Sequence, residues 1–374
     1  MTRAFVELFG VEPDGTWSAP GRVNLVGEFT DYNEGFVLPT VLPLAARATA
    51  ARRTDGVIKV ASAQGEQAEP VEARIADLRP GATGGWSSYV LGVAWALADA
   101  GHTVAGADLY IDSDVPIGAG LSSSAALECA TALALAELSE IDLDRTALAR
   151  LAQRAENEFV GVPCGVLDQM ASLLCVPGHA LLLDTRSLDM RQVPFDLESA
   201  GLALLVVDTR VSHDLGDSGY ADRRRACERA AAALGVAALR DVEPDDLGEA
   251  LGRLAEPELV RRVRHVVTED ARVLDAARLL DEGRVAEIGP VLNAAHASIR
   301  DDFESSCAEL DAAVEAALGA GALGARMIGG GFGGSAIALV GADATASTAR
   351  AVEARFAAAG WRAPLCFVAA PVGR

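Results

Sequence analysis

The chain has 374 residues, 51% of them hydrophobic, which is too long for one compact core and suits about two domains. Its formal net charge of −21 is spread along the sequence, and this argues against nucleic acid or an anionic membrane as a partner. The first ten residues do not resemble a signal peptide, and no apolar run is long enough to cross a membrane. We expect a cytoplasmic protein that acts as a monomer.

Cysteine and lysine usage bears on two further kinds of site. The six cysteines are scattered without a CxxC pair, which indicates reduced thiols and neither a disulfide framework nor a zinc site. Lys59 is the only lysine among 32 basic residues, and no GxxxxGK[ST] sequence occurs, so a Walker-type phosphate loop is excluded. Any nucleotide must therefore be held without a lysine.

The stretch from Ala19 to Asn33 concentrates polar residues in what the sequence predicts to be one short loop. Arg22 offers a planar, permanently charged guanidinium, and Glu28 and Asp31 offer carboxylate oxygens three residues apart. Such a set suits a polyhydroxylated ligand. Each residue taken alone is also compatible with an Asx turn that carries surface ion pairs.

The next part of the chain is predicted to be rich in strands. Apolar runs separated by proline, aspartate and glycine predict three strands, at residues 36–38, 46–51 and 57–62. Residues 86–98 carry apolar side chains at helical spacing, and residues 107–113 alternate as a strand.

A glycine loop at residues 116–121 then leads through three serines, 122–124, into an apolar helix. Free N–H groups and the positive end of the helix dipole at such a helix start favour phosphate. Serine hydroxyls add donors and a magnesium ligand, and no lysine is required. The alternative is an ordinary helix N-cap made of serines.

Two acidic residues follow on predicted helices. Residues 145–159 show helical spacing with Glu156 bordering the inner stripe, and Asp168 falls in the first turn of another apolar helix. The dipole there stabilises a carboxylate, which can accept a proton or orient a hydroxyl. The alternatives are a capping role for Asp168 and a surface ion pair for Glu156.

The second half begins with a strand at residues 202–207, and we place a domain boundary near residue 195. A helix opens at Ser218, and residues 245–318 are predicted to be almost all helical. His265 and His296 lie on these helices, and we interpret both as structural. The glycine run 329–334 lies between two strands. Because glycine has no Cβ, the backbone there can lie close to another group, and a tight turn is the alternative. A helix at residues 345–360 and a strand at 364–369 close the chain.

Several blocks in family order resemble galactokinases, which are members of the GHMP small-molecule kinases. The resemblance runs from about residue 17 to the C-terminus, and its main blocks are residues 21–39, 116–126, 164–169, 218–228, 263–272, 292–303 and 326–340. Two positions depart from the family pattern. Phe29 stands where the family has a histidine that contacts the sugar near its C6 hydroxyl, and Ala221 replaces the asparagine that usually follows the tyrosine at position 220.

The resemblance implies an α+β, two-domain GHMP kinase fold. Residues 1–195 are expected to form the N-terminal domain, which is ribosomal-protein-S5-domain-2-like and contains the phosphate loop. Residues 196–374 are expected to form a C-terminal, ferredoxin-like α/β sandwich.

The resemblance also implies transfer of the ATP γ-phosphoryl group to the C1 hydroxyl of α-D-galactose, with Mg²⁺. Asp168 is the implied base or orienting group, and Arg22 is implied to neutralise developing charge and to keep Asp168 a carboxylate. The implied sugar contacts are Glu28, Phe29, Thr30, Asp31 and Tyr220. The implied ATP contacts are Ser62, Gly118, Ala119, Gly120, Leu121, Ser122, Ser123 and Ser124, and the implied metal ligands are Ser124 and Glu156.

A phenyl ring at position 29 can neither donate nor accept a hydrogen bond, so we predict unusual tolerance for galactose analogues modified at C6. Packing of Phe29 against apolar neighbours is the alternative. Two other functions stay open: a GHMP kinase for a related sugar, such as an arabinose or an amino sugar, and a non-catalytic sugar sensor. The sensor predicts damage to the catalytic positions, whereas Arg22, Glu156, Asp168 and the serines 122–124 are all present.

Overall fold

The computed structural model describes residues 1–64, 69–211 and 218–369, and the chain divides into two compact units. Unit 1 comprises Met1–Arg22, Pro43–Ile117 and Ser122–Leu174. Unit 2 comprises Val23–Leu42, Gly118–Leu121 and Cys175–Arg374. The single boundary expected near residue 195 differs from this division, because three parts of the expected N-terminal domain belong to unit 2: residues 23–42, 118–121 and 175–195.

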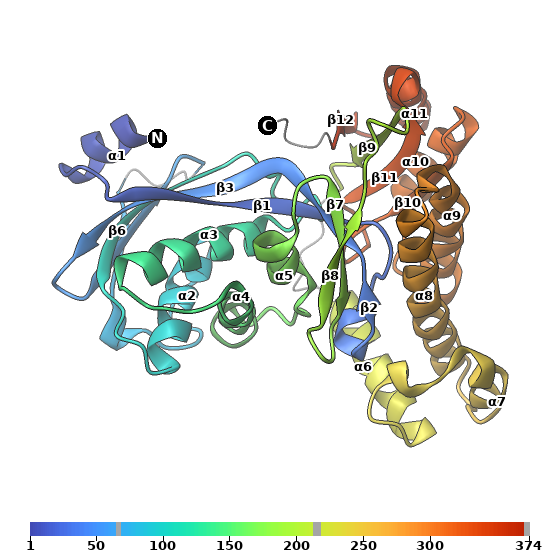
Figure 1. Cartoon of the computed structure of the whole chain (residues 1–374), viewed down its shortest axis with the longest axis horizontal. Coiled ribbons are helices and arrows are strands. Elements are labelled where there is room, and N and C mark those ends of the chain that lie inside the picture. Colours follow the sequence, from blue (N-terminus) through green and yellow to red (C-terminus); the bar gives the residue numbers. More distant parts are fainter. Residues whose placement is uncertain (65–68, 212–217, 370–374) are drawn as a thin grey trace. The chain divides into compact units, whose positions relative to one another are not determined.

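Unit 1 contains a five-stranded sheet with the order β1-β3-β6-β4-β5. The strands are β1 (Gly15–Asn24), β3 (Pro39–Arg53), β4 (Val57–Ser62), β5 (Val71–Arg74) and β6 (Gly106–Ser113). β6 runs antiparallel to β3 and parallel to β4. Helices gather on one face of this sheet (Figure 1): α2 (Ser87–Asp99), α3 (Ser123–Leu138), α4 (Arg145–Arg154) and α5 (Leu167–Leu174).

The predicted strands of unit 1 are present, with two differences. β3 is longer than predicted, since it begins at Pro39 and continues through Pro43. Its pairing with β6 starts only at Ala46, so the N–H that Pro43 lacks costs no bond in that ladder. Residues 19–24 belong to β1, so the prediction of one loop from Ala19 to Asn33 was wrong for its first part. Helix α1 (Thr2–Phe9), which buries Phe5, was not predicted.

Unit 2 contains a four-stranded antiparallel sheet in the order β10-β11-β9-β12 and a three-stranded sheet in the order β2-β7-β8. The strands are β2 (Phe36–Val37), β7 (His179–Asp184), β8 (Met190–Pro194), β9 (Leu202–Asp208), β10 (Gly324–Met327), β11 (Ser335–Gly341) and β12 (Leu365–Val368). Phe36 pairs with Asp184 and Val37 with Leu183, which explains why the 23–42 segment belongs to this unit.

Helices make up much of the rest of unit 2, as predicted. They are α6 (Ser218–Leu234), α7 (Leu247–Gly252), α8 (Pro257–Asp281), α9 (Ile288–Ser298), α10 (Ala308–Gly319) and α11 (Thr345–Ala359). Figure 1 shows the long α8 beside α9. The core of this unit packs side chains of α6, α8, α10 and α11 with those of β9, β10 and β11.

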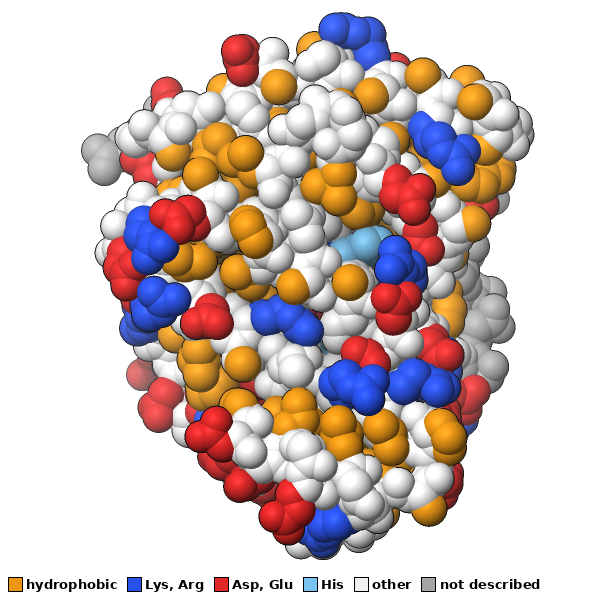
Figure 2. Space-filling model, turned by 90° about the vertical axis from the view of Figure 1, so that its right-hand side faces the viewer, with side chains coloured by type: hydrophobic (Ala, Val, Ile, Leu, Met, Phe, Trp, Pro, Cys, Tyr) orange, Lys and Arg blue, Asp and Glu red, His pale blue; other side chains and the backbone are white. Residues whose placement is uncertain are grey.

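Basic and acidic side chains lie side by side on the face drawn in Figure 2, with hydrophobic side chains scattered between them. Helix α8 supplies several exposed ion pairs, such as Arg278 with Glu282. Although the net charge of the chain is −21, acidic side chains are interspersed with basic ones on this face. In the described part of the chain, no helix is both long and apolar enough to span a membrane.

Candidate active site

An arginine–aspartate pair is fixed between a strand and a helix of unit 1. Arg22 lies near the end of β1, and Asp168 is the second residue of α5, in its first turn as predicted. Nη2 and Nε of Arg22 lie 2.6 and 2.8 Å from Oδ1 of Asp168. The side chain of Arg22 is 6% exposed and that of Asp168 27% exposed. Both contacts end on Oδ1, so the arginine holds the carboxylate while Oδ2 remains for another donor.

The helix that carries Asp168 is tied to the strand that carries Arg22. The hydroxyl of Ser172, one turn further along α5, donates to the carbonyl oxygen of Pro20 at 2.7 Å. Pro20 and Arg22 are two residues apart in β1. This bond, together with the ion pair, gives the carboxylate a defined position.

The serines that follow the glycine loop start α3. Ser122 has left-handed backbone angles (φ 58°) at the helix N-cap, and its buried hydroxyl oxygen has no hydrogen-bond partner among the described residues. The hydroxyl of Ser124 lies near the carboxylate of Glu156 and acts to lower the pKa of that group. Two residues predicted to act together are thus close to one another.

Glu156 lies in a turn that the sequence did not predict. Helix α4 ends at Arg154, and residues Ala155–Val160 form a π-helical turn, a local distortion often found at functional sites. The turn leaves Glu156 buried. Burial, and then repulsion from Asp168, raises the pKa of Glu156 to about 7.

A second buried carboxylate, Glu128, was missed by sequence analysis. Nε2 of Gln169 donates to Glu156 at 2.9 Å and to Glu128 at 3.1 Å, so one amide bridges both carboxylates. Burial, and then repulsion from Glu156, raises the pKa of Glu128 well above its usual range. A charged residue within the apolar helix that follows the serines was the available signal.

These oxygen atoms suit a magnesium ion that takes most of its ligands from outside the protein. Ser124 and Glu156 supply hard oxygen atoms near one another, and the hydroxyl of Ser122 has no hydrogen-bond partner among the described residues. Among the described residues, no group of three or more His, Cys, Asp or Glu side chains could hold a metal. Mg²⁺ usually takes one or two protein ligands and completes its shell with phosphate oxygens and water, so this limited set fits it.

In unit 2, part of the polar segment predicted to bind sugar is used for internal bonds. Oε1 of Glu28 accepts the N–H of Gly329 at 2.8 Å and lies 3.3 Å from Nη2 of Arg326. The hydroxyl of Thr30 is buried between the carbonyl oxygens of Gly27 and Phe36, at 2.9 and 2.6 Å. Thr30 therefore closes the loop, a role that the sequence did not predict. Asp31 opens a 3₁₀ turn, Asp31–Asn33.

Phe29 belongs to the apolar core of unit 2. Its ring is 4% exposed and stacks on Phe303 with centroids 4.2 Å apart. Tyr220 lies 6.2 Å away between ring centroids and also contacts the ring of Tyr32. At this position the structure therefore shows the alternative, in which Phe29 packs against apolar neighbours. Tyr220 lies beside its ring.

The first part of the predicted phosphate loop, Gly118–Leu121, packs against the glycine run 329–334, also within unit 2. The hydroxyl of Ser335 donates to the carbonyl oxygen of Ala119 at 2.6 Å. A Cβ placed on Gly329, whose φ is 77°, would lie 3.1 Å from the carbonyl oxygen of Gly120. The prediction that the glycines permit a close backbone approach is confirmed.

The remaining candidate residues are Ser62, which makes local hydrogen bonds, and two histidines, which contact residues distant in the sequence. Ser62 ends β4 and bonds only locally among the contacts described, accepting the N–H of Gln64 at 3.2 Å. His265 is buried, with Nδ1 2.9 Å from Ser298 Oγ and Nε2 3.1 Å from the carbonyl oxygen of Glu28. His296 lies 3.3 Å from Asp311 and accepts the N–H of Met327. Both histidines have the structural role expected.

Three family models match the chain. They are the galactokinase galactose-binding signature over residues 3–52, the GHMP kinases N terminal domain over residues 88–175 and the GHMP kinases C terminal over residues 276–360. The first two ranges contain Arg22, Glu28, Ser124, Glu156 and Asp168. These five candidate residues thus lie within the matched regions, whereas Ser62 and Tyr220 lie outside them.

Whole-chain relatives agree with these models. Galactokinase of Streptomyces coelicolor is 57% identical over 368 residues, which cover 98% of this chain and 95% of the relative. Galactokinase of Bos taurus is 44% identical over 361 residues, covering 95% and 91%. The crystal structure of Lactococcus lactis galactokinase complexed with galactose has a TM-score of 0.94 at 32% identity and covers 99% and 97%. A mevalonate kinase structure, with a TM-score of 0.66 at 16% identity over 95% and 98%, shares the fold.

Proposed function

Because the chain belongs to the galactokinases of the GHMP kinase family, we propose that it transfers the γ-phosphoryl group of ATP to the C1 hydroxyl of α-D-galactose. The product is galactose 1-phosphate. The observation that carries the chemical step is the Arg22–Asp168 pair, in which the arginine uses one carboxylate oxygen and leaves the other for a hydroxyl.

Asp168 acts on the nucleophile in this proposal. Phosphoryl transfer passes through a loose transition state and depends mostly on positioning and charge neutralisation. Oδ2 of Asp168 accepts the hydrogen of the C1 hydroxyl and orients the oxygen, while Arg22 keeps the carboxylate in place. The permanently charged guanidinium also offsets negative charge that develops during transfer.

We propose that the loop from Gly118 to Ser124 binds the phosphates of ATP. Its support is the combination of left-handed glycines, the N-terminus of α3 and the hydroxyl of Ser122, which has no hydrogen-bond partner among the described residues. Ser124 and Glu156 would hold Mg²⁺, which neutralises phosphate charge when bound. For Ser62 only its place at the end of β4 supports a nucleotide contact.

For the sugar we propose contacts from Glu28, Asp31 and Tyr220. The close similarity to a galactokinase complexed with galactose supports galactose as the substrate. Phe29 and Thr30 then act by shaping the segment, given that both are buried.

Tolerance at C6 is a separate proposal. It rests on the absence of a hydrogen-bonding group at position 29, and the packing of Phe29 on Phe303 means that the ring itself need not touch the sugar. Measuring kcat/KM for galactose and 6-deoxygalactose in the parent and in Phe29→His tests it. Restoring one net hydrogen bond, worth about 1 kcal/mol, should shift the ratio about fivefold toward galactose. An unmoved ratio in a folded variant refutes the proposal.

The main function is tested by ADP release from Mg-ATP with a panel of sugars. Galactose should give the highest kcat/KM, with arabinose and amino sugars as the discriminating alternatives. Galactose 1-phosphate should form in a one-to-one ratio with ADP. Release of ADP at the same rate without any sugar would overturn the proposal.

We further propose that the protein is a cytoplasmic monomer. All six cysteines are free thiols, which agrees with a reducing compartment. Sedimentation velocity at micromolar concentration tests the oligomeric state, and a species of twice the 38.6 kDa chain mass would contradict it.

A further inference from the structure

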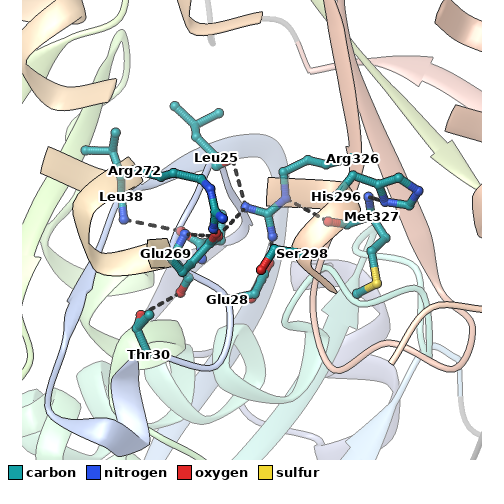
Figure 3. Close-up of polar contacts among 12 residues, drawn as sticks. Leu25, Glu28, Thr30, Leu38, Glu269, Arg272, His296, Ser298, Arg326 and Met327 are labelled. Carbon is teal, nitrogen blue, oxygen red and sulfur yellow. Dashed lines mark hydrogen bonds and ion pairs between the residues drawn. The ribbon is translucent and has the colours of Figure 1, made fainter. Parts of the chain in front are cut away.

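We propose that Arg326 and Glu269 are positioning residues for galactose: from β10 and α8 they fix the backbone of residues 25–28, and so they set the place of Glu28. The proposal deepens the proposed function and rests on it for the identity of the sugar. Figure 3 shows the guanidinium of Arg326 directed toward Leu25, Glu28 and Glu269.

The two charged side chains are fully buried, and such burial is energetically costly. Arg326 and Glu269 are both 0% exposed. Burying a charge costs several kcal/mol even when it is paired, and an apolar pair of similar volume is often equally stable. The contacts that the two side chains make are therefore more informative than their presence.

Nε and Nη1 of Arg326 donate hydrogen bonds, whereas Nη2 makes an ion pair and has no hydrogen-bond partner among the described residues. Nη1 donates to the carbonyl oxygen of Leu25 at 3.0 Å, and Nη2 lies 3.3 Å from Oε1 of Glu28. Nε donates to the carbonyl oxygen of Met327 at 2.9 Å, which fixes the plane of the guanidinium. One side chain therefore holds both a backbone atom and the side chain of the segment.

Glu269 holds Gly27, which lies between Leu25 and Glu28. Its Oε1 accepts the N–H of Gly27 at 2.9 Å and lies 3.6 Å from Nη1 of Arg326. Its Oε2 pairs with Nη1 of Arg272 at 2.5 Å. Burial alone raises the pKa of Glu269, but attraction to Arg326 and Arg272 outweighs it and the pKa is lowered. Glu269 is thus a carboxylate that accepts from the segment.

Gly27 has little freedom to compensate for a lost partner. Its φ is 101°, and a Cβ there would lie 2.7 Å from the carbonyl oxygen of Phe36. His265 lies 3.1 Å from the carbonyl oxygen of Glu28 and completes the set. Residues 25, 27 and 28 are all held by side chains from outside the segment. Removal of Arg326 therefore takes a donor from the Leu25 carbonyl and an ion pair from the Glu28 carboxylate, which still accepts the N–H of Gly329.

Two substitutions separate positioning from simple stability. Arg326→Lys keeps a positive charge but loses the planar fork, and Glu269→Gln keeps an oxygen for Gly27 but loses the charge. Arg278→Gln is the matched control, because it removes an ion-paired arginine from the exposed face of the same helix as Glu269. Steady-state KM values for galactose and ATP are measured together with hydrogen–deuterium exchange of the ligand-free protein.

We expect either core variant to raise the KM for galactose at least tenfold while the KM for ATP and kcat change less than threefold. Peptides covering residues 23–37 should exchange faster in ligand-free variants, and the control should match the parent. If Arg326→Lys does not fold, Glu269→Gln decides by the same criteria. An unchanged KM for galactose, or equal rises in both KM values with faster exchange throughout the chain, would overturn the proposal.

The two proposals fail in different ways. A parent protein that does not phosphorylate galactose would refute the proposed function. The exchange measurement would still decide whether Arg326 and Glu269 hold residues 25–28, because it needs no substrate.

Discussion

Replacing Asp168 by asparagine tests the catalytic assignment most directly. The side chain keeps its size and an oxygen that can accept from Arg22, so Arg22, which is 6% exposed, is not left without a partner. What is lost is the charge that makes the two Arg22 contacts charge-assisted, and the capacity to take a proton. A charged hydrogen bond contributes about 1.5–3 kcal/mol and a neutral one about 0.5–1.5 kcal/mol. The difference, reduced by the partial exposure of Asp168, gives a stability loss of about 1 kcal/mol.

The expected loss of activity is larger. General base catalysis contributes about 10²- to 10⁴-fold, which corresponds to about 3–5 kcal/mol of activation free energy. We therefore expect Asp168→Asn to lower kcat at least 100-fold, with the KM for ATP within threefold of the parent and the melting temperature reduced by no more than about 4 °C. ADP release at saturating galactose and Mg-ATP measures the rate, and scanning calorimetry measures the stability.

Asp144→Asn is a matched control for the capping alternative. Asp144 is the N-cap of α4 and accepts the N–H of Ala147, so the change alters a purely capping aspartate at another helix start. It should leave kcat unchanged. If Asp168→Asn turns over within a few-fold of the parent, as the control does, then Asp168 is not the base and only caps α5.

Three further predictions follow from the same contacts. Arg22→Lys can reach Oδ1 of Asp168 with one donor instead of two, so it should lower kcat more than it raises KM, and a pure KM effect would make Arg22 a binding residue. Ser124→Ala and Glu156→Gln should each raise the Mg²⁺ concentration needed for half-maximal rate, and an unchanged requirement in both would show that phosphates and water alone hold the metal. Burial raises the pKa of Asp270 to about 7, above its ordinary value near 4. The raised pKa therefore adds its full share to the free energy of unfolding below about pH 4, and this share is lost as the pH rises to 7. Asp270→Asn, which keeps an acceptor for the N–H of Phe36, should therefore gain melting temperature relative to the parent at pH 8 but not at pH 4, and an equal difference at both would count against the raised pKa.

The parts of the site that depend on local pattern could be predicted from the sequence. Apolar spacing placed Asp168 in the first turn of a helix, and the glycine loop and serines placed Ser122 to Ser124 at the start of another. These features follow from interactions within a few residues, such as helix capping and side-chain periodicity. That Glu156 acts together with Ser124 was implied only through family resemblance.

Other parts could not be predicted because they depend on residues far apart in the chain. Glu28 and Arg326 are separated by 298 positions, and neither of their local sequences indicates an ion pair. Phe29 has left-handed backbone angles (φ 68°), and the direction of its ring into the core was not visible in the motif that contains it. The π-helical turn at Glu156 likewise has no counterpart in the regular helical spacing of the sequence.

The division of the chain into units has a consequence for how the protein is made on the ribosome. The chain passes from one unit to the other after Arg22, Leu42, Ile117, Leu121 and Leu174. Strand β2 emerges about 140 residues before its partner β7, and Gly27 emerges more than 240 residues before Glu269. The 23–42 segment must therefore wait until residue 269 has been made before all of these partners exist, and such non-local pairing folds slowly. A nascent chain cut near residue 195 contains β7 but lacks Glu269, so the two halves of the gene should not yield two independently folded halves of the protein.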